Sequence, residues 1–518
     1  MNNLAPPGRF PHTAAMLLIF SPVAMASEPP AGIARLAAAL HGAQIPCRLL
    51  DANCEAQLWL LGQPSAADDT WSRRARKGRV QNLATLRDPE SYNSPGRYSR
   101  AVSDLNRLLA ISGEGEEAMV GLADYQHRRL SPLRSADLLA AAEQPRENPF
   151  FPWFSRRLPE LLDGVRTVGF SLNFLSQALC TFAMIGYLRN NIPGLTIILG
   201  GGLVTSWLSR PDWSSPFGAL VDHLVAGAGE APLLTLLGAG EVAQNQVMPE
   251  YGLLPRHDYL SPGLILPYSA SSGCYWNDCS FCPERAEGNR FRPVPPGRAV
   301  EELRELTARE KPCLIHLLDN AITPALLRRI TEHPPGAPWY GFARFGPELE
   351  EPDFCRALKA SGCVMLKLGL ESGDQGVLDR LRKGIDLTAA SRILLNLRQA
   401  GIGVYLYLLF GTPAETELQA RRTLEFVLRH KETIGFLNLA LFNMPLFGAE
   451  AGELATEPFY AGDLSLYTGF RHPHGWDRKL VRRFLDHEFK KEPTIAAILR
   501  NDPPLFGSNH APFFSGNR

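Results

Sequence analysis

The stretch that decides the fold is Ser272-Gly-Cys274-Tyr-Trp-Asn-Asp-Cys279-Ser-Phe-Cys282-Pro283, which places three cysteines within nine residues. The gaps between these cysteines are four and then two residues long. A thiolate is a soft, anionic ligand for iron or zinc. Three thiolates on one tight loop can hold three corners of an iron–sulfur cube, and the fourth corner then stays open to a ligand that is not protein.

Two other kinds of site share parts of this pattern. A structural zinc site closes its tetrahedron with a fourth Cys or His, and no His follows the trio at finger-like spacing. A plant-type two-iron ferredoxin site has the same spacing and takes its fourth Cys later in the chain, where Cys313 is available. Cys313 opens an apolar run that is more typical of a strand than of a ligand loop. The spacing alone leaves both alternatives open.

The chain after the cysteines alternates apolar runs with amphipathic helical stretches up to about Met444, as successive βα units do. This alternation predicts a parallel sheet whose functional residues lie at the carboxyl ends of the strands. The runs are Leu264–Ala270, Cys313–Leu318, Trp339–Phe345, Val364–Leu370, Val404–Phe410 and Phe436–Phe442.

With a three-cysteine loop after the first of six strands, this stretch resembles the radical S-adenosylmethionine (radical SAM) core, a partial (β/α)6 TIM-like barrel. The commonest spacing in that family is x3 then x2, so the x4 gap is a departure that concerns the shape of the loop. The resemblance implies a 4Fe-4S cluster on Cys274, Cys279 and Cys282. It also implies SAM-binding positions before the last Cys and at the ends of the second, fourth and fifth strands: Phe281, Asp319, Asn320, Glu371, Ser372 and Gly411.

The N-terminal part predicts an open, doubly wound α/β sheet, which binds ligands at the carboxyl ends of its strands. The predicted strands are Met16–Ser21, Cys47–Asp51, Thr167–Leu172, Leu195–Leu199 and Asp222–Ala226, with helices at Gly32–Leu40, Gln177–Asn190 and Ala231–Leu237. Residues 56–160 are polar and helical, and we interpret them as a helical insertion.

This domain resembles the Rossmann-like cobalamin (vitamin B12)-binding domain that precedes many radical SAM cores. The resemblance implies cobalamin-binding positions at Ser171, Gly200, Gly201, Gly202, Gly229 and Glu230. Asn173 stands where that family has Leu. The family's lower-ligand motif, Asp-x-His-x-x-Gly, is absent from Ser21–Ser27, so the lower face of the cobalt would be free or water-bound. The three glycines are also compatible with a plain tight turn.

Length and composition limit the number of domains and the kinds of partner. The chain has 518 residues, enough for two or three domains, and 53 basic residues balance 53 acidic ones, which gives no overall footprint for nucleic acid. We predict a disordered lead-in at 1–13, a cobalamin-binding-like domain at 14–240, a linker at 241–263, a radical SAM core at 264–445 and a C-terminal extension at 446–518. Nine cysteines are too few for a disulfide scaffold and suit a reducing, cytoplasmic setting.

The N-terminal run Ala14–Ala26 resembles a secretory segment, but the strand–helix–strand pattern after it favours a buried first strand. No run of about 20 apolar residues predicts a membrane span. Near the other end, Trp476–Lys491 predicts an amphipathic helix. The aromatic stretch Leu505–Phe514 is either a strap packed on the barrel or a lid over its mouth.

The barrel lumen is expected to be partly polar, with substrate candidates at His316, Arg344, Lys367, Tyr405 and Tyr407. A buried Lys needs a partner, and Glu371 or Asp319 could pair with Lys367. His316 alone is more often a satisfied core residue than a catalyst.

The resemblance implies cleavage of SAM to a 5′-deoxyadenosyl radical, with a flavodoxin- or ferredoxin-like reductant, and methyl transfer to carbon through cobalamin. The substrate would be a small molecule or a peptide. One alternative is a radical SAM enzyme whose N-terminal domain is a scaffold without cobalamin. Another is a non-catalytic iron–sulfur protein for electron transfer or binding, although such a protein needs no SAM pocket.

Overall fold

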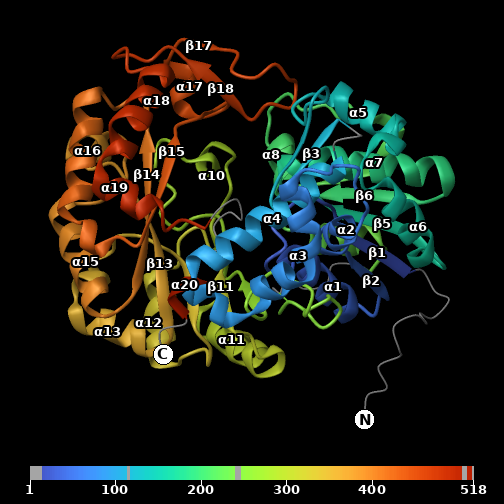
Figure 1. Ribbon diagram of the computed structural model, residues 1–518, viewed down its shortest axis with the longest axis horizontal. Helices are drawn as coiled ribbons and strands as arrows, with labels where there is room; N and C mark the ends of the chain where they lie inside the picture. The colour runs from blue at the N-terminus through green and yellow to red at the C-terminus, as the bar shows by residue number, and fades with distance from the viewer. Residues whose placement is uncertain (1–14, 114–116, 240–246, 504–509, 516–518) are drawn as a thin grey trace.

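The computed structural model describes residues 15–113, 117–239, 247–503 and 510–515, and its chain folds around two parallel sheets. The sheet built early in the chain and the sheet built later lie side by side in Figure 1, each with helices packed around it. The predicted disordered lead-in at 1–13 lies outside the described residues. Within the described part, no helix is both long and apolar enough to cross a membrane.

The first sheet has the strand order β2-β1-β5-β6-β7, with every neighbouring pair parallel. Its strands are β1 (Ala15–Phe20), β2 (Cys47–Asp51), β5 (Val165–Ser171), β6 (Thr196–Gly200) and β7 (His223–Val225). The run that resembles a secretory segment therefore supplies β1, which pairs with β2 on one side and β5 on the other. The strand order reverses between β1 and β5, and ligands of open α/β sheets bind in the crevice at such a point.

Helices cover both faces of this sheet. They are α1 (Ala31–Gly42), α7 (Leu175–Asn191), α8 (Gly202–Leu208) and α9 (Glu230–Leu236), joined by the inserted helices α2 (Ala52–Leu61), α3 (Thr70–Arg87), α4 (Pro95–Gly113), α5 (Ser135–Glu143) and α6 (Phe151–Leu161). The insertion also contains an antiparallel hairpin, β3 (Ala118–Val120) with β4 (Tyr125–His127). The insertion is thus mainly helical, and its two strands were not predicted because strands of three residues leave no readable alternation.

The second sheet has the order β15-β14-β13-β12-β11-β8, again all parallel. Each strand coincides with one predicted apolar run: β8 (Ile265–Tyr268), β11 (Leu314–Leu317), β12 (Trp339–Ala343), β13 (Cys363–Glu371), β14 (Gly403–Phe410) and β15 (Phe436–Leu441). Neighbours in the sheet follow one another in sequence, so the sheet curves as a partial barrel with β8 and β15 at its edges.

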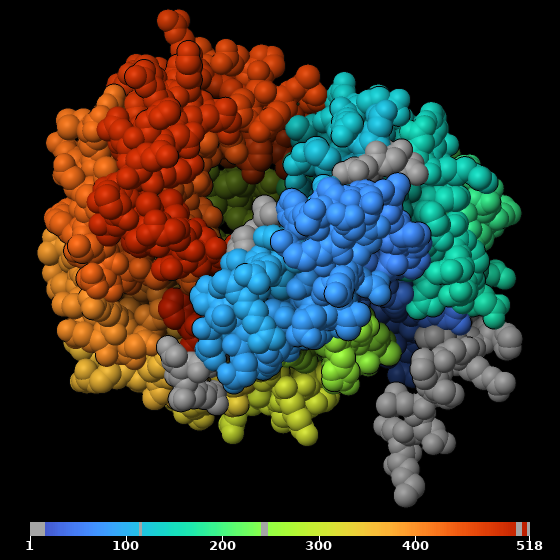
Figure 2. Space-filling view, viewed as in Figure 1, coloured from blue at the N-terminus to red at the C-terminus, as the bar shows by residue number. Residues whose placement is uncertain are grey.

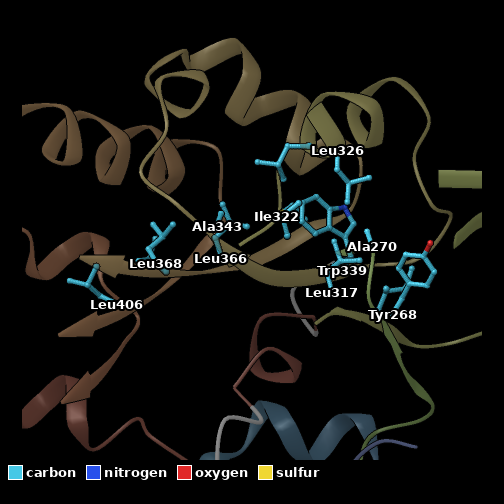
Figure 3. Close-up of a cluster of buried hydrophobic side chains, with 14 of the residues drawn as sticks. Tyr268, Ala270, Leu317, Ile322, Leu326, Trp339, Ala343, Leu366, Leu368 and Leu406 are labelled. Carbon is cyan, nitrogen blue, oxygen red and sulfur yellow. The ribbon is translucent and has the colours of Figure 1, made fainter. Parts of the chain in front are cut away.

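Helices pack on the outer face of this curved sheet: α11 (Pro296–Glu310), α12 (Pro324–Glu332), α13 (Pro352–Ala360), α14 (Gln375–Arg380), α15 (Leu387–Gln399) and α16 (Glu417–Arg429). Trp339, Leu317 and Leu366 on the strands pack against two further side chains, Ile322 just before α12 and Leu326 in α12 (Figure 3). All five side chains are at most 3% exposed. Complete burial of such a side chain stabilises the fold by about 1.5–3 kcal/mol.

The inner face of the sheet is closed at the amino ends of its strands by the last described segment, which contains α20 (Pro512–Ser515). The His510 ring lies 4.2 Å from Tyr405 and 4.5 Å from Phe436, and Phe514 lies 5.4 Å from Phe436, all between ring centroids. Phe513 contacts an aromatic pair of the insertion, Tyr92 and Tyr98. Residues 510–515 thus form a strap at the end of the barrel opposite to the cysteine loop, and the lid interpretation is wrong for them. Residues 505–509 of the predicted stretch lie outside the described residues.

A different part of the C-terminal extension reaches across to the first unit. It contains β16 (Met444–Pro445), α17 (Ala449–Glu453), β17 (Thr456–Glu457), β18 (Tyr467–Phe470), α18 (Arg478–His487) and α19 (Pro493–Leu499). Leu464 packs into the core of the first unit, and its N–H donates to the Leu133 carbonyl at 3.0 Å. Asp463 Oδ1 accepts from the Ser135 N–H at 2.8 Å. Figure 2 shows a hollow between this extension and the first unit.

Candidate functional site

The cysteine loop follows β8 at the carboxyl edge of the barrel sheet. A short antiparallel pair fixes its base, β9 (Ser271–Ser272) with β10 (Arg292–Pro293). Gly273 has φ +70°, and a Cβ there would lie 2.6 Å from the Arg290 carbonyl oxygen, so the loop requires glycine at this point. Cys282 precedes α10 (Pro283–Ala286), the short helix visible in the space between the two units in Figure 1.

The three cysteines are free thiols in the structure. Burial raises the pKa of Cys279, and the positive charges of Lys383 and Arg344 oppose that rise. Burial also raises the pKa of Cys282, opposed by the backbone N–H groups of Arg285 and Glu284. These donors and cations favour the thiolate form that a metal ligand needs.

The four-residue gap between Cys274 and Cys279 contains Trp276, which packs on a distant segment. Its indole Nε1–H donates to the Arg382 carbonyl at 3.0 Å, and the Arg344 guanidinium lies 4.1 Å from the centroid of its ring. A Cβ on Gly384, at φ +65°, would lie 2.3 Å from the indole. Trp276 thus docks the four-residue stretch between Cys274 and Cys279 on the segment that contains Arg382 and Gly384.

Cys313 lies away from this loop. It stands just before β11, and its side chain faces Gly263 and the cluster under the C-terminal strap. The cysteine loop lies beyond the other end of the neighbouring strand, roughly 13 Å further along for four residues. Cys313 therefore cannot be the fourth ligand of a two-iron site. Among the described residues, no group of three His, Cys, Asp or Glu side chains surrounds a single point as the ligands of one ion do. The ligands of a cubane sit at separate corners instead.

Glu371 ends β13 with φ +70°, an unusual conformation for a residue other than glycine. Its Oε1 accepts a hydrogen bond from Lys383 Nζ at 2.7 Å, and both side chains are nearly buried. The Lys383 ammonium lies 5.5 Å from the centroid of Phe281. A Cβ on Gly369 would fall 2.5 Å from Glu371 Oε1, so the glycine makes room for the pair. The structure thus brings Glu371 and Phe281 together beside the cysteines.

The other predicted SAM positions make internal contacts. Asp319 accepts from the Ala270 N–H at 3.1 Å and also from the Ser271 hydroxyl, so it anchors the start of the cysteine loop. Burial raises its pKa. Asn320 is exposed and hydrogen-bonds Glu284 at the start of α10. Ser372 is fully buried, with its hydroxyl 3.3 Å from Thr423 Oγ1 on α16.

The turn after β14 is held by a carboxylate. Gly411 has φ +78°, and its N–H donates to Glu415 Oε2 at 2.6 Å. The same oxygen accepts from the Trp476 indole at 3.1 Å, while Oε1 is buried without a hydrogen-bond partner. Burial raises the pKa of Glu415 to about 7.

The predicted cobalamin positions lie at the carboxyl edge of the first sheet. A Cβ on Gly201, at φ +110°, would lie 2.4 Å from the Leu172 carbonyl oxygen. Asn173 accepts from the Gly202 N–H at 2.9 Å and donates to Ser171 Oγ at 3.0 Å, so it bridges the loops after β5 and β6. Gly200 ends β6, and Gly229 precedes α9, where Glu230 forms an ion pair with Arg35 of α1 at 2.5 Å.

This edge also exposes apolar surface, since Phe174 is 54% exposed and Leu175 is 36% exposed. The loop at 21–27, where the family motif would lie, is packed instead. Its Ser21 carbonyl accepts from Gln177 at 2.7 Å, and its Ala24 N–H donates to Asn53 at 2.7 Å. Ser21 Oγ is buried without a hydrogen-bond partner.

The barrel lumen contains a polar cluster that joins the two units. Lys367 Nζ lies 3.3 Å from His316 Nε2, and His316 Nδ1 lies 3.0 Å from both carboxylate oxygens of Glu28. Burial lowers the pKa of Lys367 to about 8 and lowers that of His316, and the Glu28 charge opposes both shifts. The expected pairing of Lys367 with Glu371 or Asp319 is wrong. Sequence reasoning missed Glu28, because a lone Glu in a loop 288 positions away gives no signal.

The remaining lumen candidates divide into two groups. Arg344 holds the cysteine loop, with Trp276 under its guanidinium and Cys279 Sγ 4.0 Å from Nη1. Tyr405 and Tyr407 lie 4.7 Å apart between ring centroids on β14, and burial raises the pKa of both phenols. Tyr405 also contacts His510 of the strap, so it stands at the closed end of the lumen.

Comparison with known proteins gives one family match. Residues 268–427 match the model of the radical SAM superfamily. The chain is 27% identical over 189 residues to an uncharacterised methyltransferase of Pyrococcus horikoshii, a match covering 35% of this chain and 40% of that protein. It is 24% identical over 182 residues to bacteriochlorophyllide d C-12(1)-methyltransferase of Chlorobaculum tepidum, covering 32% and 38%. The matched region thus spans less than half the length of these curated relatives.

Two solved structures share the arrangement over most of the chain. The radical SAM methyltransferase TsrM of Kitasatospora setae, solved with cobalamin and a 4Fe-4S cluster, aligns with TM-score 0.52 at 14% identity, covering 86% of this chain and 78% of that one. The cobalamin-dependent SAM radical enzyme OxsB, solved with aqua-cobalamin and SAM, aligns with TM-score 0.53 at 12% identity, covering 91% and 66%. The chain therefore carries a radical SAM domain at residues 268–427, within a two-sheet α/β fold shared with these cobalamin-dependent radical SAM enzymes.

Proposed function

We propose that the chain is a radical SAM enzyme that transfers a methyl group to carbon with the help of cobalamin. When bound, a 4Fe-4S cluster supplies the electron that cleaves SAM to a 5′-deoxyadenosyl radical, and cobalamin supplies a methyl carrier. The observation that carries the proposal is the gathering of three free thiols and the Glu371–Lys383 pair at one edge of the barrel sheet.

Each residue of that edge has a physical task. Cys274, Cys279 and Cys282 would hold three corners of the cluster. Trp276 and Arg344 keep the cysteine loop against the segment after β13. Glu371 offers a second carboxylate oxygen to a donor group of SAM, while Lys383 keeps the other oxygen in place.

The first sheet fits a large, partly apolar cofactor at its carboxyl edge. Gly200, Gly201 and Gly202 keep side chains out of that edge, and Phe174 and Leu175 offer exposed apolar surface beside it. Residues 21–27 contain no imidazole, so no protein nitrogen from that loop would bind the lower face of the cobalt.

A scaffold without cobalamin is the second candidate, and one observation favours it. The approach of Gly201 to the Leu172 carbonyl requires glycine whether or not a ligand is present. A pure electron-transfer protein is less well supported, because it has no use for Glu371 in a strained conformation beside the cysteines.

The test is anaerobic purification with hydroxocobalamin, addition of a flavodoxin or ferredoxin as reductant, and assay with SAM. We expect retained cobalt, 5′-deoxyadenosine, and S-adenosylhomocysteine from methyl loss. 5′-Deoxyadenosine without retained cobalt or S-adenosylhomocysteine would favour the scaffold candidate. Absence of both products from an iron-loaded chain would overturn the radical SAM assignment.

A further inference from the structure

The polar cluster of the lumen combines residues of both units. His316 and Lys367 point inward from β11 and β13, and Glu28 comes from the loop after β1, at the point where the strand order of the first sheet reverses. Several hydrogen bonds hold that loop, among them those from Gln57 to the Ala24 carbonyl and from Leu260 to the Ala26 carbonyl. These hydrogen bonds fix the loop that places Glu28 against the barrel.

The hydrogen-bond partners of His316 determine which of its ring nitrogens carries the proton. Lys367 is an ammonium donor, so the Nε2 atom facing it accepts, and the proton of the neutral ring sits on Nδ1 and is donated to Glu28. The ring stacks on Tyr340 with centroids 4.4 Å apart and planes 7° apart, which holds its orientation. A neutral imidazole thus separates one cation from one anion.

The cation of this cluster is enclosed. Lys367 is 2% exposed, and its ammonium lies 5.0 Å from the ring centroids of both Tyr340 and Phe342. Cation–π contact and the bond to His316 stabilise the charge without water. A ligand in the lumen therefore meets the rings and not the ammonium.

Glu28 is the end of this cluster that solvent can reach. The Glu28 side chain is 19% exposed and that of His316 is 14% exposed. Among the described residues, no Lys or Arg forms an ion pair with Glu28, which faces His316 Nδ1 at 3.0 Å. A carboxylate accepts about four hydrogen bonds, so capacity remains for a further donor. The Lys367 charge stands behind the imidazole, on its Nε2 side.

We propose that Glu28, oriented by His316 and Lys367, is an anchor in the substrate chamber for a protonated amine of the substrate. An ammonium group fits because it supplies both the missing counter-charge and additional N–H donors. The assignment to a substrate chamber rests on the proposed function, since it takes the chemistry to occur at the neighbouring carboxyl edge of the same barrel. The binding of an amine to Glu28 can be measured without that chemistry.

The experiment uses the full chain with ¹⁵N-labelled histidine, and the His316 signals are assigned from the His316→Gln variant. Ethylammonium chloride is titrated as the cationic probe, and sodium propionate of similar size is the anionic probe. We expect a saturable shift of the His316 nitrogens with ethylammonium and none with propionate. Both probes are titrated into the wild-type chain, and the His316→Gln variant serves only to assign the signals, so the outcome does not depend on how a variant binds the probe.

Glu28→Gln keeps an acceptor for His316 but removes the charge, and it should weaken ethylammonium binding by about tenfold or more. Glu250→Gln is the matched control, because Glu250 also faces a histidine, His41 Nδ1 at 2.7 Å, outside the lumen. Unchanged binding is expected there. A wild-type chain without a saturable shift, an equal response to propionate, or undiminished binding in Glu28→Gln would each overturn the proposal. Failure of the proposed function would appear separately, as absence of 5′-deoxyadenosine.

Discussion

Lys383 Nζ lies 2.7 Å from Glu371 Oε1, and this pair stands directly beside the cysteine loop. Glu371→Ala should therefore lower the affinity for SAM by about tenfold or more, because a charge-assisted hydrogen bond is lost. Equilibrium binding of SAM to the iron-loaded chain measures the change, with Glu432→Gln, an exposed carboxylate, as control. Iron content should stay the same. Loss of iron in Glu371→Ala would show that the residue supports the loop and not the ligand.

The cysteines carry the next prediction. Replacing Cys274, Cys279 and Cys282 together by Ala should abolish the cluster, while the wild-type chain should hold about four irons and four sulfides after anaerobic reconstitution. Cys313→Ala is the control, since Cys313 lies beside Gly263 at the amino end of β11, away from the cysteine loop. Its iron content should equal that of the wild type. A zinc ion bound in place of iron would contradict the assignment.

The strands of both sheets could be predicted because buried parallel strands are near-continuous apolar runs. The Trp339 and Val364 runs are examples, since each lies between two neighbouring strands and under a layer of helices. The cysteine loop was predictable for a different reason, because its ligands are close in sequence.

Contacts between distant segments were not predictable. Lys367 was expected to pair with Glu371 on its own strand or with Asp319 after the second barrel strand, but the carboxylate whose charge acts on it, Glu28, comes from the other unit. The aromatic tail was recognisable as apolar, yet nothing in Phe513 or Phe514 says which end of the barrel they cover. Such choices depend on which cavity the rest of the chain leaves open.

Glu415 gives a prediction for pH. Burial raises the pKa of Glu415 from its ordinary value of 4.5 to about 7 in the fold, so the folded chain holds a proton that the unfolded chain releases between these values. Stability from this group is complete below pH 4.5 and is lost as the pH rises through 7, by roughly 3 kcal/mol in all. Glu415→Gln mimics the protonated form, and its unfolding midpoint should exceed that of the wild type increasingly from pH 5 to pH 8. Exposed Glu417→Gln should follow the wild type. If the difference in unfolding midpoint between Glu415→Gln and the wild type does not change with pH, Glu415 does not hold a proton in the folded chain.

Removing the Phe514 ring from the strap is expected to lower the stability of the fold. Phe514 fills the space that Gly403 and Gly435 leave, with a Cβ on Gly403 falling 2.7 Å from its ring. Phe514→Ala should cost about 2–3 kcal/mol, less than a fully buried Phe because the side chain is partly exposed. Denaturant unfolding measures this cost, and Phe174→Ala, at 54% exposure, should change stability by about 0.5 kcal/mol or less. Equal effects would mean that the strap does not support the barrel.

The last prediction concerns Gly200, Gly201 and Gly202 at the carboxyl edge of the first sheet. Gly201→Val is unsuitable as a probe, because its Cβ would clash with Leu172 and disturb the turn itself. Gly202 begins α8 and is exposed, and the nearest atom to a Cβ built there would be Asn173 Oδ1 at 3.7 Å. Gly202→Val should therefore fold normally while its side chain occupies space at the ligand edge.

In a chain purified anaerobically with hydroxocobalamin, we expect Gly202→Val to retain at least about tenfold less cobalt than the wild type, since close backbone approach is lost. Iron content and 5′-deoxyadenosine formation without substrate should persist, because they depend on the other sheet. Gly42→Val is the control, as a Cβ there meets no atom within 4 Å and the residue ends α1, away from β5 and β6. Equal cobalt in Gly202→Val and wild type would remove this turn from the cofactor site. No cobalt in the wild type itself would leave the first sheet as a scaffold.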